Sequence, residues 1–158
     1  MAKLQSDLSE FIELLNSRRV EYLVVGGHAV AFHGHPRLTG DVDFFLRNTR
    51  QNGERVLAVL KEFGFGALAL SVDDLTVPNR IVQLGRPPNR IDLLTSISGV
   101  SFDDAWPTRV VGDLGGHAVN FIGRDALLKN KMASDRDKDR LDVKKLRAIS
   151  ARNQGSST

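Results

Sequence analysis

The chain contains no cysteine, so disulfide bridges, thiolate nucleophiles and zinc sites built from cysteine are excluded. No apolar run approaches the roughly 20 residues that a bilayer-spanning helix needs. Residues 1–20 are charged and amphipathic, and they lack the apolar core of a signal peptide. We therefore expect a cytoplasmic protein that does not associate with membranes. The four histidines lack zinc-type spacing with carboxylates, so surface or core positions are expected for them.

What the chain does contain is the composition of one globular domain. Its 158 residues are enough for a hydrophobic core, and its 41% hydrophobic and 26% charged residues are ordinary for a soluble protein. The sequence has neither an internal repeat nor a low-complexity linker. It therefore predicts one domain over residues 1–150 and a flexible C-terminal tail over residues 151–158.

Hydrophobic periodicity predicts a chain in which helices and strands alternate. The predicted helices cover residues 4–17, 28–32, 54–63, 101–106, 124–133 and 137–149. The predicted strands cover residues 22–25, 41–46, 81–84, 90–95, 109–111 and 118–122, with residues 67–72 as a further candidate. Residues 48–53 are expected to form a turn, and residues 73–78 a turn or a single helical turn. This pattern predicts an α/β (α+β) fold, with a mixed twisted sheet and flanking helices.

Two acidic residues, Asp41 and Asp43, stand within the apolar strand predicted over residues 41–46. Side chains alternate across a strand, so both carboxylates project from the same face. Aspartate is depleted in strands, and two like charges this close repel each other. A surface pair or an Asx turn would also explain them, but their alternation within an apolar strand favours a bound divalent cation.

Gly26 and Gly27 follow the predicted strand 22–25 and precede a short predicted helix. Without side chains, their backbone N–H groups can approach phosphate oxygens closely. A plain tight turn is the alternative explanation for two adjacent glycines.

Asp92 is the only acid in the strand-like run 90–95. A site that holds two metal ions needs a third carboxylate from a neighbouring strand, and Asp92 would supply it. Such a carboxylate is costly to bury without a partner, so a salt bridge to Arg90 or Arg80 is the alternative.

The C-terminal part of the chain is basic. Residues 124–153 carry ten lysines and arginines against five aspartates, a net charge of +5, which leaves −2 for the rest of the chain. A basic segment beside an acidic site suits a polyanionic substrate, and a solvated helix face is the alternative.

The order of these features resembles the signature of the DNA polymerase beta-like nucleotidyltransferase superfamily. In this chain, thirteen residues separate Gly26-Gly27 from the Asp41-Val42-Asp43 motif, and Asp92 follows on a later strand. More narrowly, residues 25–43, 102–106 and 128–143 are similar to small bacterial nucleotidyltransferases related to the abortive-infection and toxin–antitoxin nucleotidyltransferases. The resemblance covers roughly residues 8–149 and implies a minimal polymerase-beta-type fold.

The resemblance also implies a role for each matched position. Asp41, Asp43 and Asp92 would be the catalytic carboxylates and would bind two Mg²⁺ ions, with Asp92 also assisting deprotonation of the acceptor hydroxyl. The residues expected at the phosphates of a nucleoside triphosphate (NTP) are Gly26, Gly27, Arg37, Thr39, Lys131 and Arg136. Supporting roles are open for His28, Asp139 and Asp142, of which the two aspartates would orient Lys131 or Arg136 or form helix ion pairs.

Three functions follow as expectations. The first is magnesium-dependent transfer of a nucleoside monophosphate from an NTP such as ATP to a hydroxyl of a small molecule, tRNA or protein. The second is a nucleotidyltransferase-fold component of a toxin–antitoxin or regulatory pair, which acts mainly by binding a partner such as a small helical protein. The third, a basic nucleic-acid binder, lacks the aromatic strands or recognition helix that such proteins carry. No acceptor-binding domain is evident, so an open cleft, a homodimer or a partner protein would have to supply that site.

Overall fold

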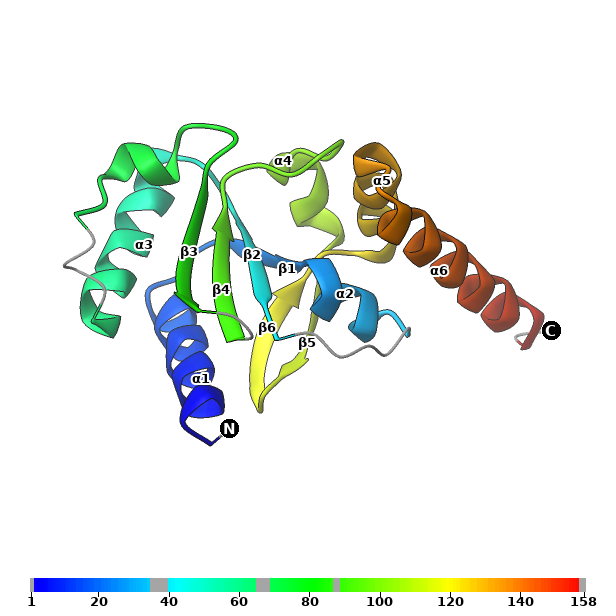
Figure 1. Ribbon diagram of the computed structural model, residues 1–158, viewed down its shortest axis with the longest axis horizontal. Coiled ribbons are helices and arrows are strands. Elements are labelled where there is room, and N and C mark those ends of the chain that lie inside the picture. Colours follow the sequence, from blue (N-terminus) through cyan, green and yellow to red (C-terminus); the bar gives the residue numbers. More distant parts are fainter. Residues whose placement is uncertain (1, 35–39, 65–68, 87–88, 157–158) are drawn as a thin grey trace.

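The computed structural model describes residues 2–34, 40–64, 69–86 and 89–156. A six-stranded sheet in the order β3-β4-β2-β1-β6-β5 lies at its centre, with helices on both faces (Figure 1). The pairs β1–β2, β3–β4 and β5–β6 are antiparallel, whereas β2–β4 and β1–β6 are parallel. This mixed sheet confirms the predicted α/β (α+β) class.

The elements alternate along the chain as the periodicity predicted. The helices are α1 (Ala2–Ser17), α2 (Gly26–Phe32), α3 (Arg50–Phe63), α4 (Phe102–Ala105), α5 (Arg124–Ser134) and α6 (Asp137–Ser156). The strands are β1 (Tyr22–Val25), β2 (Val42–Leu46), β3 (Ile81–Arg86), β4 (Asn89–Leu94), β5 (Val110–Leu114) and β6 (His117–Phe121). Two short 3-10 helices are η2 (Val72–Leu75) and η3 (Trp106–Thr108).

Two predicted boundaries in the first half of the chain were wrong. Residues 48–53, expected as a turn, include the first turn of α3, because the Thr49 hydroxyl caps the helix by accepting from the Asn52 N–H at 3.3 Å. The candidate strand 67–72 is not formed over its described part, where residues 69–71 are irregular and η2 begins at Val72. Residues 65–68 lie outside the described residues.

The last helix is longer than expected. α6 runs to Ser156, past the predicted end at Ile149 and into the segment 151–158 that we expected to be a tail. No proline interrupts residues 137–156, so no residue in this stretch removes a helical hydrogen bond. Within the described ranges, no helix combines the length and the apolarity needed to cross a bilayer.

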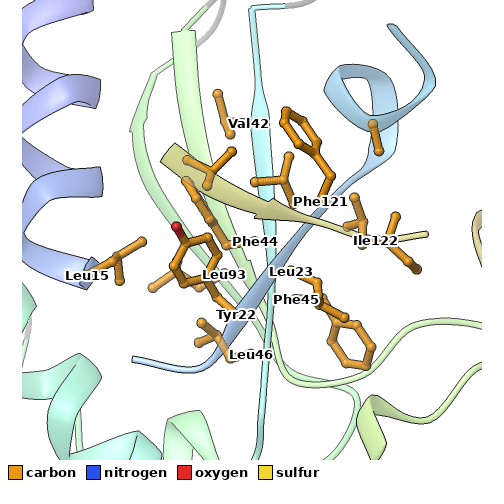
Figure 2. Close-up of a cluster of buried hydrophobic side chains, with 14 of the residues drawn as sticks. Leu15, Tyr22, Leu23, Val42, Phe44, Phe45, Leu46, Leu93, Phe121 and Ile122 are labelled. Carbon is orange, nitrogen blue, oxygen red and sulfur yellow. The ribbon is translucent and has the colours of Figure 1, made fainter. Parts of the chain in front are cut away.

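β2 is buried on both faces of the sheet, and its two faces have different neighbours (Figure 2). On one face, the Phe44 ring packs edge-on against Phe11 of α1 and Tyr22 of β1, with centroids 5.6 and 5.5 Å away. On the other face, the Phe45 ring lies 5.2 Å from Phe102 of α4. Asp43 shares the face of Phe45, because side chains two apart on a strand project to the same side. The fold therefore presents Asp43 on the face that carries α4.

The buried side chain of Asn52 ties α3 to the ends of β1 and β2. Its Oδ1 accepts from the Glu21 N–H at 2.8 Å, and its Nδ2 donates to the Glu21 and Arg47 carbonyls at 3.0 and 2.9 Å. Glu21 precedes β1 and Arg47 follows β2, so these bonds fix the end of the strand pair that carries Asp43.

We predict that Asn52→Ala lowers the free energy of unfolding by about 2–3 kcal/mol, because it leaves partly buried backbone groups without a partner. Denaturant unfolding measures this loss. Gln51→Ala is the matched control, since Gln51 is an exposed neighbour on the same helix. Equal stabilities of the two variants would contradict the role assigned to Asn52.

Candidate active site

Two carboxylates lie side by side where β2 and β4 run parallel. Asp43 of β2 is the register partner of Asp92 of β4, so both side chains leave the same face at the same level. Asp92 is buried, with 8% of its surface exposed, and Asp43 is half-buried. On its other side, Asp43 pairs with Val25, the last residue of β1. We call Asp43 and Asp92 the acid pair.

Within the acid pair, the negatively charged form of Asp43 is unfavourable. The pKa of Asp43 is raised to about 6, chiefly by burial and then by repulsion from Asp92 and a hydrogen bond to it, with a smaller contribution from Asp41. The positive charge of Lys131 acts in the opposite direction. Two adjacent buried carboxylates of this kind require a proton or a cation between them to relieve their repulsion.

Gly26 lies against the acid pair in a way that only glycine permits. Its φ is +71°, and a Cβ built on it would stand 2.1 Å from Asp43 Oδ2. Gly26 and Gly27 are not a turn ahead of the helix, as we had expected, but the first two residues of α2. The backbone at the start of α2 therefore directly contacts the Asp43 carboxylate.

Arg90 bridges Asp92 to the third acid, Asp41. Its Nε donates to Asp92 Oδ1 at 2.7 Å and its Nη2 to Asp92 Oδ2 at 3.2 Å. The same Nη2 lies 3.4 Å from Asp41 Oδ2, and the Arg90 N–H donates to Asp41 Oδ1 at 3.2 Å. The hydrogen bond to Asp92 is the main cause of a raised pKa for Arg90. The salt bridge that we had left open for Asp92 is thus made with Arg90.

The three acids suit a hard divalent cation by their chemistry, because carboxylate oxygens are the ligands that Mg²⁺ prefers and the acid pair is short of positive charge. They are not assembled as a three-ligand site. Among the described residues, no group of three or more His, Cys, Asp or Glu side chains is placed to hold a metal ion. Asp41 precedes β2 and is turned to Arg90. For all three acids to bind a cation, the Arg90 side chain would have to move away from Asp41 and Asp92.

A second charged cluster joins α5 to α6. The Lys131 ammonium is buried and lies 3.1 Å from Asp139 Oδ1 and 3.4 Å from Asp142 Oδ2. Arg136 Nε donates to Asp139 Oδ2 at 2.7 Å, and Ser134 Oγ donates to the same oxygen at 2.6 Å. Burial alone would raise the pKa of Asp139, but the hydrogen bonds from Arg136, Ser134 and Lys131 outweigh it and lower that pKa. Asp139 therefore holds both cationic side chains.

A cleft of about 540 Å³ brings the two clusters together. Four of the predicted site residues line it, namely Gly26, Asp43, Lys131 and Arg136. Its other walls are Val25, Ile81, Leu94, Ser96, Ile97, Ser98, Asn130, Ala133 and Ser134. The cleft thus has a carboxylate and a glycine on one side, cations on the opposite side, and apolar residues from β3 and the end of β4 between them.

The remaining predicted residues lie elsewhere. Arg37 and Thr39 fall outside the described residues. Neither Gly27 nor His28 is among the described residues that line the cleft, and burial lowers the pKa of the half-buried His28. Asp41 and Asp92 adjoin Asp43 rather than line the cleft, and Asp142 acts through Lys131.

Sequence reasoning gave no site role to several residues that contact these groups. Arg90 stands two positions before Asp92 on β4, a spacing that places both on one face, but only the structure shows that it also bonds Asp41. Ser134 completes the Asp139 cluster, and Ser96 and Asn130 line the cleft. No pattern in the sequence distinguishes these three from ordinary polar surface residues.

Residues 4–156 match the family described as Nucleotidyl transferase of unknown function (DUF2204). The chain belongs to this nucleotidyltransferase family. A comparison with curated proteins found no match to this chain.

Two solved structures share the fold of this nucleotidyltransferase. One is the lincosamide antibiotic adenylyltransferase LnuA with lincomycin bound, with a TM-score of 0.53 and 16% identity over 91% of this chain and 96% of that one. The other is the antibiotic-resistance factor ANT(2'')-Ia in solution, with a TM-score of 0.54 and 12% identity over 98% of this chain and 95% of that one. The fold is therefore that of polymerase-beta-like nucleotidyltransferases.

We predict that Asp43→Asn stabilises the metal-free protein more at pH 7.5 than at pH 4. The raised pKa of Asp43 means that the folded state binds its proton more tightly than the unfolded state. This contribution to stability is complete at low pH and is lost as pH rises from the ordinary carboxyl value of 3.8 through about 6. Melting temperatures of both proteins in a chelator, at the two pH values, measure the difference. A gap between variant and wild type that does not change with pH would rule out the raised pKa.

Proposed function

We propose that the protein transfers a nucleoside monophosphate from an NTP to a hydroxyl group, with Mg²⁺ at its carboxylates. The observation that carries this proposal is the cleft, in which Asp43, backed by Asp92, faces Lys131 and Arg136 across a space of about 540 Å³. Carboxylates for cations and cationic side chains for phosphates are the two components that this transfer requires. Membership of a nucleotidyltransferase family supports the same reaction.

In this reaction, the acceptor oxygen bonds to the α-phosphorus, the bond from that phosphorus to the bridging oxygen breaks, and pyrophosphate leaves. Asp41, Asp43 and Asp92 would hold the two metal ions. When bound, Mg²⁺ neutralises the charge that develops on the phosphate oxygens and lowers the pKa of the acceptor hydroxyl. Asp92 is the member of the acid pair that we assign to the hydroxyl proton, because its carboxylate lies beside Asp43 on the adjacent strand.

The phosphates of the NTP would lie between Gly26 and the two cationic side chains. Because Gly26 has no Cβ, its backbone can come close to the phosphates. We extend this role to Gly27, which lies in the same helical turn. Lys131 and Arg136 supply positive charge opposite, and Asp139 fixes both in place at 3.1 and 2.7 Å. We keep Arg37 and Thr39 as proposed phosphate contacts.

The names of the two similar structures guide the choice of donor and acceptor. One is an adenylyltransferase of a lincosamide antibiotic, and the other an antibiotic-resistance factor. By this analogy, ATP is the first donor to test and a small hydroxylated compound the first acceptor, before tRNA or protein.

One observation favours the second function, that of a partner-binding component of a toxin–antitoxin or regulatory pair. Arg90 bonds both Asp41 and Asp92, so an internal cation already neutralises part of the negative charge of these acids. A fold that only binds a partner, a small helical protein or a second copy, needs no more than this. The two functions differ in whether Arg90 leaves when Mg²⁺ and NTP bind.

The transfer reaction is tested with labelled ATP, CTP, GTP and UTP, Mg²⁺ and a panel of hydroxylated small molecules, tRNA and protein. We predict Mg²⁺-dependent release of pyrophosphate with transfer of the label, and a loss of at least about 100-fold in Asp43→Asn. Asp113→Asn is the matched control, because Asp113 is an exposed aspartate on the edge strand β5. Transfer that is absent with every nucleotide, or equal in Asp43→Asn, would contradict the enzymatic proposal.

We further predict that Arg90→Ala increases the stabilisation of the protein by Mg²⁺. Without the guanidinium, the acids lose their internal cation, so the metal-free protein becomes less stable and gains more when the metal binds. The rise in melting temperature on adding MgCl₂ measures the effect. Arg80→Ala serves as the control, since the Arg80 side chain is exposed and was the other candidate partner of Asp92. A smaller metal-induced rise in Arg90→Ala than in wild type would show that Arg90 helps to build the cation site.

A further inference from the structure

A second cavity of about 260 Å³ adjoins the cleft at the carboxyl ends of the parallel strands β2 and β4. Residues just past β2 (Arg47, Asn48 and Thr49), just past β4 (Thr95 and Ser96) and around the start of α4 line it. Ser96 also lines the cleft, so the two cavities are neighbours that share one wall residue. We call this cavity the side pocket.

The side pocket lies on the catalytic face of the sheet. Phe45, which lines it, and Asp43 are two apart on β2 and project to the same side, and Arg47 continues the same row. At about 3.3 Å per residue, Arg47 is on the order of 13 Å along the chain from Asp43. A molecule of a few linked rings in the side pocket can therefore place one hydroxyl at the acid pair.

Aromatic side chains form one wall of the pocket. Phe45 and Phe102, both buried, contact each other edge-on at 5.2 Å, and the Trp106 ring stacks on Phe102 at 5.3 Å. The Arg47 guanidinium lies 4.6 Å from the centroid of the Phe102 ring. Within the segment 102–106, which had no assigned role in the reaction, Phe102 and Asp103 line the pocket and Trp106 packs on Phe102. The apolar edge of this wall can contact the C–H groups of a saturated ring.

Hydroxyl groups form the rim. The Thr49 hydroxyl accepts from the Asn52 N–H at 3.3 Å, and the Ser101 hydroxyl accepts from the Asp104 N–H at 3.1 Å. Because each oxygen acts as an acceptor in a helix cap, its own O–H can still donate to a ligand. Apolar contact on one side and donors on the other suit a compound that carries several hydroxyls on a ring.

The charges of the side pocket disfavour a polyanion. The one cation that lines it, among the described residues, is Arg47, whose Nε donates to Glu21 Oε2 at 2.5 Å and whose Nη1 bonds Asp103. Asp103 also lines the pocket, and 83% of its side chain is exposed. The arginine is thus matched by two carboxylates, which leaves no excess positive charge for a nucleic-acid backbone.

We propose that the side pocket binds the acceptor of the transfer reaction, and that this acceptor is a sugar-like small molecule, neutral or positively charged. The reaction itself rests on the proposed function. The binding site does not rest on that function, because the binding of a sugar to it can be measured without nucleotide or metal.

The direct test is a titration of the full chain, followed by backbone amide NMR, with neutral sugars and amino sugars from glucose and glucosamine to disaccharides. A short RNA with a free 3' end is titrated in parallel. We expect saturable shifts confined to residues 47–49, 95–96 and 100–103 with at least one sugar. Absence of such shifts with every sugar, or shifts at these residues with the RNA alone, would overturn the assignment. Tighter binding of glucosamine than of glucose would indicate that the acceptor is a positively charged amino sugar.

Two substitutions on α4 form a matched pair for this test. Asp103 lines the side pocket, whereas Asp104 is a neighbour that is also exposed and is outside the set of described residues that line it. We expect Asp103→Trp to fill the pocket and weaken sugar binding at least tenfold, and Asp104→Trp to leave it unchanged. In transfer assays, Asp103→Trp raises the KM for the acceptor and leaves the KM for the NTP unchanged. An unchanged acceptor KM would overturn the pocket alone, while sugar binding without any transfer would overturn the reaction alone.

Discussion

The repulsion between two carboxylates at the same level of adjacent strands is the constraint on which the site depends. Asp43 and Asp92 are placed together by the parallel register of β2 and β4; Asp92 is buried and Asp43 is half-buried. Burying two like charges in this way is unfavourable unless a proton or a cation relieves it. In this structure two cations counteract the repulsion, the guanidinium of Arg90 at Asp92 and the more distant ammonium of Lys131, and the raised pKa of Asp43 shows that they do not remove it.

The surrounding structure is arranged around that charge. Gly26 has no side chain because a Cβ would collide with Asp43, and this leaves bare backbone where phosphates would approach. On the opposite wall, Asp139 positions Lys131 and Arg136, so the cleft holds negative charge on one side and positive charge on the other. In the proposed reaction, a magnesium-bound triphosphate would match both walls at once. The side pocket lies beyond Ser96, and we propose that it binds a neutral or positively charged acceptor rather than a second polyanion.

The sequence predicted the parts of this arrangement that depend on local spacing. Alternation along one strand predicted that Asp41 and Asp43 share a face, and helical periodicity located most elements. The sequence could not show which carboxylate oxygens Arg90 bonds, because these bonds depend on the conformation of its side chain and on the register of two strands distant in sequence. The start of α3 was misjudged because the cap by Thr49 overrode the turn-like composition that follows. The sequence could not predict the side pocket, because the pocket forms where three separate segments of the chain meet.

We propose that the acid pair holds divalent cations against a triphosphate. The most direct measurement is a crystal structure with Mn²⁺ and a non-hydrolysable ATP analogue, read from the anomalous signal of the metal. We expect metal peaks within coordination distance of Asp43 and Asp92, phosphates between Gly26 and Lys131, and Arg90 turned away from the acids. A triphosphate bound elsewhere, or Arg90 still paired with Asp92 and no metal beside it, would contradict the account.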